Sequence, residues 1–523
     1  MSNTSDQAAA SGYWVDLICG HIQKLYPEGE LLVCSGITPS GPYHLGHSRE
    51  VLVPDAILRG LREHGRVIRH VHFVDDFDAL RKRYPYLPES YESEAGKPLY
   101  LVPAPDGKSK SYADQYFNEY LNATKKLGIE MEVVRIHQEY QKGAFAELIS
   151  LSLQKRDQIA EILHRVGGRA VEDGWQPIQV LDETSNSLRT AKFVGFNSQT
   201  GLVNYLGTDG KEHQANIAKG QVKLDWRVHW PAWWKIWGNQ LEGFGREHAT
   251  KGGSYDTGKA IMEEVFGSPA PYPVPYETIN LKGETKKMSS SIGNLVSITD
   301  TLQIIPPEIL RYFTFKSRPE RQLFFDPGIG LYNLVDEYAK TESETLAGEE
   351  PEFKRSWQIA SLQGDEHVVS TVPFSHLVTV YQTAQGEDEE ILELLNRTGH
   401  QEAVKTQKDS ILRECEYIRR WLKKFAPETV KFEIQQKLPK LELRSEQEKF
   451  LNKLAEELSG GSFEPEAIHT AIYETSVACD LKPGDAFKLI YQLFIAKDSG
   501  PKAGYFLASL DKQFVLDRLA RKA

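Results

Sequence analysis

The first eighty residues contain two short apolar runs on either side of an amphipathic segment. Residues 31–35 are apolar and stop at glycine and proline, and residues 67–74 alternate before an acidic stretch. Between them, residues 47–63 place apolar side chains on one face at helical spacing. This pattern predicts a βαβ unit, the beginning of a Rossmann-like parallel sheet.

The following part of the chain mixes helical and strand patterns. Residues 112–127 and 143–166 have helical periodicity, and short β-like runs with glycine and asparagine turns follow between residues 193 and 222. This mixture predicts a domain inserted into the sheet.

Sheet-like signals resume near Trp226 and His248. A predicted helix at residues 256–266 and a polar loop rich in lysine and serine at 282–294 follow. We expect the interrupted parallel sheet to be completed in this part.

Beyond residue 338 the patterns are almost purely helical. The stretch 341–352 is acidic and contains glycine, so we interpret it as a linker. The clearest helical stretches are residues 389–395, 409–425, 445–458 and 465–477. They predict a separate α-helical domain.

The predicted fold class is therefore α/β, with a Rossmann-type parallel-sheet domain, an inserted α+β domain and an all-α C-terminal domain. The predicted boundaries are 1–82 and 225–337 for the two halves of the sheet domain, 83–224 for the insertion and 338–523 for the helical domain.

Composition narrows the class of protein. The 523 residues are 40% hydrophobic and 26% charged, and no apolar run approaches the roughly 20 residues that span a bilayer. No export signal is visible at the N-terminus, so a cytoplasmic location is expected. A net charge of −11 argues against a general nucleic-acid binder, so such a partner would need local basic patches. The four cysteines are scattered along the chain without a CxxC pair and are expected to be buried thiols.

Glycines and two histidines fill the turn between the first predicted strand and helix, where residues 35–47 read SGITPSGPYHLGH. Glycine lets the backbone approach a ligand, a helix N-terminus offers unpaired N–H groups, and imidazoles can donate to phosphate oxygens. His44 and His47 are three positions apart and would share one helical face. The turn suits a polyphosphate, although a glycine-rich turn with two surface histidines is an alternative interpretation.

A second candidate element lies in the predicted polar loop, where residues 286–291 read KKMSSS. Phosphoryl and nucleotidyl transfer need stabilising charge more than covalent help from the protein. Lys287 is therefore the expected source of that charge. Alone, the string also suits a solvated turn.

The turn with two histidines precedes the lysine- and serine-rich loop, and the predicted insertion and the second part of the predicted sheet lie between them. His44-Leu45-Gly46-His47 resembles the HIGH signature, and Lys287-Met288-Ser289-Ser290-Ser291 resembles the KMSKS signature, of class I aminoacyl-tRNA synthetases. The segments SGITPSG, HFVDDFDALRK, LDWRVHWPAWW, GREHATKGGSYDTGK and GPKAGYFLASLD resemble the class I lysyl-tRNA synthetases, and together they span nearly the whole chain.

The resemblance implies a lysine-tRNA ligase that activates L-lysine with ATP, releases pyrophosphate, and transfers lysyl to the 3′ terminal adenosine of tRNA(Lys). Mg²⁺ is expected with ATP because of the phosphate chemistry, and no membrane partner is expected. No protein-bound zinc is predicted, because the cysteines and histidines lack partners at metal-ligand spacing. A monomer is favoured, although the sequence does not determine the oligomeric state. The helical domain is implied to read the anticodon.

Matching the family motifs position by position implies a set of site residues. The catalytic residues on the ATP phosphates would be His44, His47, Lys287, Ser289 and Ser291. The other ATP-binding residues would be Gly46, Gly245, Gly253, Asp256 and Met288. The amino-acid pocket would contain Gly36, Thr38, Trp226, His248 and Tyr276, with His248 also on the adenosine side.

Further residues are open to two interpretations. Asp75, Asp76 and Asp78 offer carboxylates for a substrate ammonium group, or form a solvated turn. Trp230, Trp233 and Trp234 are expected in the core, leaving Trp226 as the candidate of that cluster. The segment 419–425, RRWLKKF, could hold RNA, but Trp421 and Phe425 suit a core position better.

The sequence also departs from the family pattern. Ser290 replaces the second lysine of KMSKS, and Lys286 could substitute in part. Pro54 lies inside the helix after the HIGH motif, where it predicts a kink or a later start. Residues 182–213 contain no cysteine pair, so the insertion is expected to be stabilised by packing alone.

Other functions remain as alternatives. The signatures also suit a class I synthetase for another amino acid, such as glutamate, cysteine or arginine. A synthetase-like protein that binds tRNA or an amino acid without charging is a second alternative. A nucleotidyltransferase of cofactor synthesis is a third, although those chains are much shorter.

Overall fold

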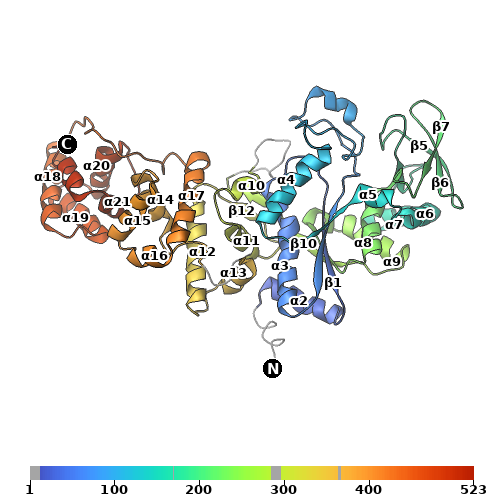
Figure 1. The fold of residues 1–523 in the computed structure, drawn as a ribbon, viewed down its shortest axis with the longest axis horizontal. Helices are drawn as coiled ribbons and strands as arrows, with labels where there is room; N and C mark the ends of the chain where they lie inside the picture. Colours follow the sequence, from blue (N-terminus) through green and yellow to red (C-terminus); the bar gives the residue numbers. More distant parts are fainter. Residues whose placement is uncertain (1–11, 169, 284–295, 363–366, 523) are drawn as a thin grey trace. The chain divides into compact units, whose positions relative to one another are not determined.

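The structure is a computed structural model that describes residues 12–168, 170–283, 296–362 and 367–522. The chain divides into two compact units (Figure 1). The first contains residues up to 302 with 311–325 and 358–360, and the second contains residues 303–310, 326–357 and those from 361 onward. The domain boundaries expected from the sequence stay a prediction.

The first unit is built on a five-stranded parallel sheet with the strand order β10-β9-β1-β2-β3. Its strands are β1 (Leu31–Ile37), β2 (Ile68–Val74), β3 (Glu132–Arg135), β9 (Leu241–Gly245) and β10 (Tyr272–Tyr276). The chain leaves β1 for β2 on one side, and β9 pairs with β1 on the other. Such a reversal of strand order opens a crevice at the carboxyl ends of the strands, where ligands bind in open α/β sheets.

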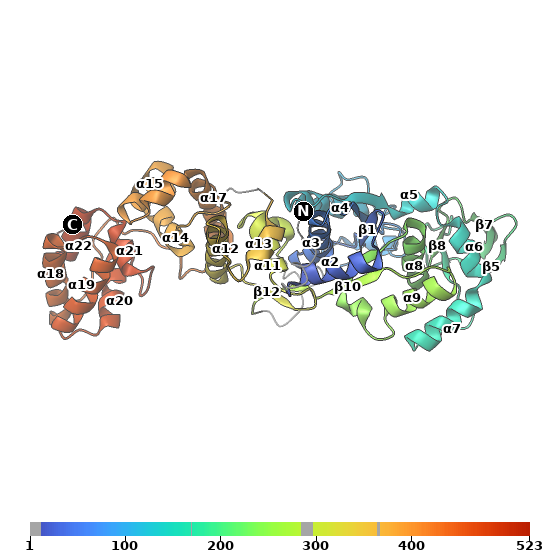
Figure 2. The same ribbon diagram turned by 90° about the horizontal axis from the view of Figure 1, so that it is seen from below.

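The helix α3 (Arg49–Glu63) connects β1 to β2 and confirms the predicted βαβ unit. Its apolar stripe is buried, with Val53, Ile57 and Leu61 at most 1% exposed. Helix α2 (Trp14–Leu25) packs beside α3, as Figure 2 shows, and Cys19 Sγ lies 3.7 Å from the carbonyl oxygen of Ile57. The predicted helix start at residue 47 is replaced by a 3₁₀ turn, η1 (Leu45–Ser48).

Pro54 does not interrupt α3, which begins before it and continues past it. A Cβ atom at Gly243 of β9 would lie 2.9 Å from Pro54 Cγ, so the proline ring rests directly on the strand backbone. The proline ring therefore takes part in the contact between the helix and the sheet.

The remaining elements of the first unit include those of the predicted insertion. The helices are α4 (Tyr112–Lys126), α5 (Ile136–Gln141), α6 (Ala146–Gln154), α7 (Arg156–Gly167), α8 (Trp226–Trp237), α9 (Ser254–Glu264) and α10 (Ile298–Thr301), with the 3₁₀ turns η2 (Glu89–Glu94) and η3 (Arg246–Ala249). The short strands are β4 (Ile178–Val180), β5 (Lys192–Asn197), β6 (Leu202–Leu206), β7 (Glu212–Asn216), β8 (Val222–Leu224), β11 (Ile279–Leu281) and β12 (Leu323–Phe325). Antiparallel pairing joins β5, β6 and β7, and also β4 and β8.

Two predictions for these elements were wrong. The stretch near Trp226 is helix α8, because Asp225 caps its first turn and Gly238 ends it in the left-handed region, while the strand itself is β9. His248 follows that strand in η3. The single helix predicted at residues 143–166 is two helices, because the backbone leaves helical geometry at Lys155.

A buried carboxylate stabilises the insertion, so the expectation of packing alone was wrong. Asp182 Oδ1 accepts from the N–H and the hydroxyl of Thr184 at 3.0 and 2.7 Å. Asp182 Oδ2 accepts from the hydroxyls of Ser185 and Thr190, both at 2.9 Å, and from Thr208 N–H at 3.1 Å. These bonds hold the pKa of Asp182 well below its usual range and fasten the loop at 182–190 to the turn after β6.

The second unit is helical in its described residues, as predicted. Its helices are α12 (Gly330–Leu346), α14 (Phe374–Thr383), α15 (Asp388–Arg397), α16 (Gln401–Thr406), α17 (Lys408–Lys424), α18 (Ser445–Gly460), α19 (Pro465–Ala478), α20 (Pro483–Ile495), α21 (Ala503–Ala508) and α22 (Lys512–Leu519). Residues of α11 (Pro307–Phe315) and α13 (Lys354–Ala360) are divided between the two units. No helix among the described residues combines the length and the apolar character needed to cross a membrane.

The linker predicted at residues 341–352 was wrong in its first half, where α12 continues to Leu346. Glu342 is fully buried, and its carboxylate accepts from the N–H groups of Val368 and Val369. Trp421 is also fully buried and donates to the carbonyl of Pro327 at 2.7 Å, which confirms its core position. All four cysteines are buried, as expected.

We expect Asp182→Ala to lower the free energy of unfolding by about 3 kcal/mol, because it leaves several buried donors without their acceptor. Since the folded state holds the Asp182 pKa below the ordinary value of 3.8, its contribution is complete above that pH and is lost as the pH falls further. Chemical denaturation at pH 7 and below pH 4 measures both effects. Asp173→Ala, at an exposed site, is the matched control; equal effects of the two substitutions would contradict the role of Asp182.

Candidate active site

The candidate site lies at the carboxyl end of β1, beside β9 and β10. Gly36 is the penultimate residue of β1, and a Cβ atom there would lie 3.2 Å from the ring of Trp233. Thr38 follows the strand and is half-buried. The glycine therefore allows a close approach of an indole ring to the strand, in the region expected to receive the amino acid, and a side chain there would require the ring to shift by a few tenths of an ångström.

The two signature histidines lie against each other in η1. Their ring centroids are 3.8 Å apart. His47 Nδ1 accepts from the N–H of His44, and His44 Nδ1 accepts from the N–H of Gly46, both at 3.1 Å. An imidazole that accepts at Nδ1 carries its proton at Nε2 when neutral, so both rings present Nε2–H donors. A side chain at position 46 would collide with the ring of His44 and with Thr278, which explains the glycine of the signature.

Aromatic residues from other elements support this turn. Tyr43 meets the ring of His47 edge-on with centroids 5.2 Å apart, and the Tyr120 hydroxyl of α4 donates to the carbonyl of His47 at 3.2 Å. The Tyr112 hydroxyl donates to the carbonyl of Ser40 at 2.8 Å. The sequence offered no signal for these contacts except the tyrosines on one face of the predicted helix at 112–127.

Glu50 in the first turn of α3 was not recognised from the sequence. Its Oε1 accepts from Gly36 N–H at 2.7 Å, and its Oε2 accepts from the Tyr276 hydroxyl at the end of β10. Glu50 is 9% exposed, and burial raises its pKa to about 7. The carboxylate therefore touches two of the residues expected in the amino-acid pocket.

The three aspartates after β2 have separate surroundings. Asp76 is fully buried and binds Arg135 Nε and His137 Nδ1, both at 2.6 Å. Asp75 is 2% exposed and pairs with Lys223 Nζ of β8 at 3.3 Å, while burial raises its pKa to about 6. Asp78 is partly exposed, 3.8 Å from Arg81.

The aromatic wall consists of one accessible indole over a buried cluster. Trp226 is half-buried, and its ring centroid lies 6.0 Å from that of His248. Trp230, Trp233 and Trp234 are at most 3% exposed, which confirms their core position. Only Trp226 of this group is accessible enough to line a pocket.

The residues expected beside adenosine lie on the turn from β9 to α9. Gly245 ends β9, and a Cβ atom there would lie 2.6 Å from the carboxylate of Glu247. Gly253 precedes the first turn of α9, and a Cβ atom there would lie 2.6 Å from the carbonyl of His248. Asp256 accepts from the N–H of Gly252 at 2.8 Å and shapes the same turn.

The second signature, with Lys286, Lys287, Met288, Ser289, Ser290 and Ser291, lies outside the described residues. The described chain resumes at Val296, whose carbonyl accepts from the N–H of Leu45 at 2.8 Å. The chain that follows the signature is therefore bonded to the two-histidine turn.

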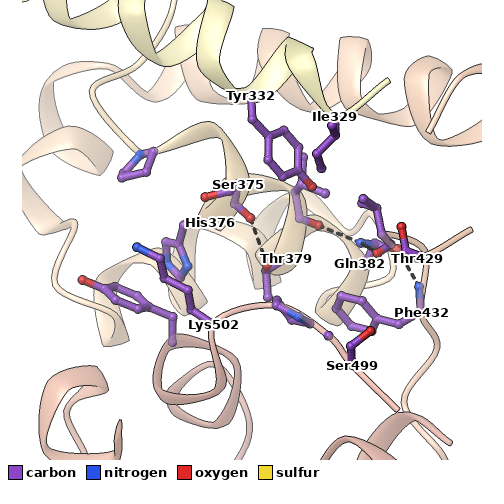
Figure 3. Close-up of a pocket in the computed structure, with 16 residues that line it drawn as sticks. Ile329, Tyr332, Ser375, His376, Thr379, Gln382, Thr429, Phe432, Ser499 and Lys502 are labelled. Carbon is purple, nitrogen blue, oxygen red and sulfur yellow. Dashed lines mark hydrogen bonds between the residues drawn. The ribbon is translucent and has the colours of Figure 1, made fainter. Parts of the chain in front are cut away.

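The helical unit contains a pocket of about 430 Å³, drawn in Figure 3. Lys502 supplies a positive charge on its wall. Burial lowers the pKa of His376, another lining residue, to about 3, so that this imidazole is neutral near pH 7. Tyr332, Phe432 and Tyr505 supply aromatic surface. The pocket thus combines flat apolar walls with a cation.

Comparison with known proteins identifies relatives along the whole chain. The sequence model of the family described as tRNA synthetases class I (K) matches residues 12–365. The lysine-tRNA ligase of Archaeoglobus fulgidus is 39% identical over 507 residues, which cover 97% of this chain and 99% of that protein. Lysine-tRNA ligase 1 of Methanosarcina acetivorans is 37% identical over 530 residues, covering 97% of each chain.

A more distant relative gives the same result. The lysine-tRNA ligase of Pyrococcus horikoshii is 33% identical over 520 residues, which cover 97% of this chain and 99% of that protein. These matches include both the parallel-sheet unit with its two-histidine turn and the helical unit. The chain therefore belongs to the family of tRNA synthetases class I (K).

Proposed function

We infer that this chain is a lysine-tRNA ligase. In the first step, a carboxylate oxygen of lysine attacks the α-phosphorus of Mg²⁺-ATP, the bond to the β-phosphate breaks, and pyrophosphate leaves. In the second, a hydroxyl of the terminal adenosine of tRNA(Lys) attacks the lysyl carbonyl, and AMP leaves. Neither step needs a covalent enzyme intermediate, so the protein acts by positioning and by stabilising charge.

The observation that carries the ATP half of the proposal is the orientation of the two imidazoles. His44 and His47 accept backbone N–H groups at Nδ1 and would donate from Nε2 to the phosphates. The other residues proposed at the phosphates are Lys287, Ser289 and Ser291. Gly46, Gly245, Gly253, Asp256 and Met288 are proposed along the remainder of ATP, with magnesium entering as part of that substrate.

The amino-acid pocket is proposed between the end of β1 and the aromatic wall. Gly36 and Thr38 would lie at its floor, and Trp226, His248 and Tyr276 around the four-carbon stem of lysine. Burying that stem against aromatic rings is favourable, and ring faces attract an ammonium group. A synthetase for glutamate or cysteine, whose side chains carry no cation, would not need this combination.

We propose that the helical unit binds tRNA. The enzyme is further proposed to be monomeric and cytoplasmic. The pocket around Lys502 supports the binding of tRNA, because flat aromatic walls suit an unpaired base and a cation suits the adjoining phosphate. A binding protein that does not charge tRNA is the second candidate, and the activity measurement below separates the two.

We expect pyrophosphate exchange to depend on lysine alone among the amino acids. His44→Ala should lower kcat for this exchange by about 100-fold or more, because it removes one preorganised donor to the transition state. His164→Ala, an exposed histidine on α7, is the control and should change little. Exchange with a different amino acid would contradict the lysine assignment, and no exchange with any would favour the binding protein.

We expect Lys502→Ala to raise KM for tRNA in aminoacylation by about 10-fold while leaving pyrophosphate exchange unchanged, because one phosphate contact is lost. Lys449→Ala removes an exposed lysine of α18 and is the matched control. Equal tRNA KM values for the two variants would show that the pocket does not bind tRNA.

A further inference from the structure

Three buried polar side chains form a cluster between β1 and β2. Ser35 of β1 stands opposite His72 of β2, and His70 lies two residues before His72 on the same strand. The Ser35 hydroxyl oxygen is 2.8 Å from His70 Nε2 and 2.7 Å from His72 Nδ1. All three side chains are at most 3% exposed. None of them is among the residues proposed to bind ATP, lysine or tRNA, so the cluster has no role in the reaction as described so far.

Both imidazoles of the cluster are neutral near pH 7, because burial lowers the pKa of His70 to about 4 and that of His72 to about 3. A hydroxyl has one proton, so Ser35 donates to one imidazole and accepts from the other. The second ring nitrogens, His70 Nδ1 and His72 Nε2, are buried and have no hydrogen-bond partner among the described residues. A buried polar atom without a partner destabilises the folded state. Packing alone therefore does not explain why histidine stands at position 72.

The ring of His72 begins a series of aromatic contacts that ends at the two-histidine turn. It stacks on Tyr120 of α4, with ring centroids 5.7 Å apart and planes inclined by 30°. The ring centroids of Tyr120 and Tyr43 are 4.6 Å apart, and Tyr43 meets the ring of His47 edge-on. The Tyr120 hydroxyl donates to the carbonyl of His47 at 3.2 Å. A single side chain, that of Tyr120, therefore separates His72 from the backbone of His47.

The hydrogen bond to Ser35 gives the His72 ring a defined plane. An imidazole bonded at Nδ1 cannot turn about its Cβ–Cγ bond without losing the geometry of that hydrogen bond. Because Tyr120 stacks on this ring, the direction of its hydroxyl is defined as well, and this hydroxyl holds the His47 carbonyl. His47 is proposed to donate from Nε2 to the phosphates of ATP. A misplacement of about 1 Å in a catalytic group can lower the rate by about 100-fold.

We propose that His72 is a positioning residue for the activation step, which holds His47 in place through Tyr120 while Ser35 sets the plane of the His72 ring. This inference rests on the proposed ligase function, in which His47 binds the ATP phosphates. His72 is fully buried and acts on the reaction only through its neighbours.

Pyrophosphate exchange with His72→Leu and His70→Leu tests this role. His70 is the matched control, because it is also buried and bonds the same hydroxyl, whereas no described ring contact joins it to Tyr120. Both substitutions remove a buried hydrogen bond and should lower the midpoint of thermal unfolding. Only His72→Leu should lower kcat, by about 10-fold, with KM for lysine unchanged. His72→Phe keeps a stacked ring and should recover part of kcat.

Equal kcat values for His72→Leu and His70→Leu would overturn the proposal. If His72→Leu does not fold, Ser35→Ala decides, because it removes only the hydroxyl that orients the ring. Ser35→Ala should lower kcat by about 3-fold with KM for lysine unchanged, and a kcat equal to that of the wild type would overturn the proposal.

A double-mutant cycle tests whether Tyr120 is the link. Tyr120→Phe removes the hydroxyl that holds the His47 carbonyl and should lower kcat by about 10-fold. Adding His72→Leu to Tyr120→Phe should lower kcat little further, because both substitutions break the same series of contacts. Losses of kcat that multiply in the double variant would overturn the route through Tyr120.

The outcome for the proposed function is distinguishable. Lysine-dependent exchange in the wild type together with a normal kcat in His72→Leu would leave the ligase assignment standing and remove His72 from the reaction. Absence of lysine-dependent exchange in the wild type would overturn both.

Discussion

Two buried charges in the first turn of α3 are the constraint on which the site depends. The guanidinium of Arg49 is fully buried and donates to the carbonyls of Glu277 and Arg321, at 2.5 and 2.9 Å. The adjacent Glu50 accepts from groups at the ends of β1 and β10. Because buried charges must keep their partners, the strand ends and the segments that follow them are fixed to one helix. The two-histidine turn directly precedes that helix, so its position is fixed by the same contacts.

The insertion uses the same principle without a metal ligand set among its described residues. Asp182 accepts hydrogen bonds from backbone and hydroxyl donors of two loops and so joins these loops. A zinc ion bound by cysteines could join two loops in the same way. The short strands β5 to β7 bury few large side chains, so a polar centre supplies order that packing does not. The insertion reaches the active-site edge through Lys223, whose charge compensates Asp75.

Local patterns predicted the parts of the fold whose cause is local. The apolar runs around β1 and β2 and the stripe of α3 are complete within the first eighty residues, and the glycines and histidines of the signature stand in one turn. Helix α8 was misassigned because its tryptophans favour strands by propensity, whereas the capping residues Asp225 and Gly238 decide the outcome. Glu50 looked like an ordinary polar residue of an amphipathic helix. Its significance comes from Tyr276, a contact between distant parts of the chain that periodicity cannot contain.

The contact between Pro54 and Gly243 links two positions far apart in the sequence. The ring of Pro54 lies where any side chain at position 243 would stand. A larger residue on β9 would have to displace the proline, and with it the first turn of α3 that carries Arg49 and Glu50. Evolutionary change at either position is therefore restricted by the other. Descendants of this sequence should keep proline and glycine as a pair or replace them together.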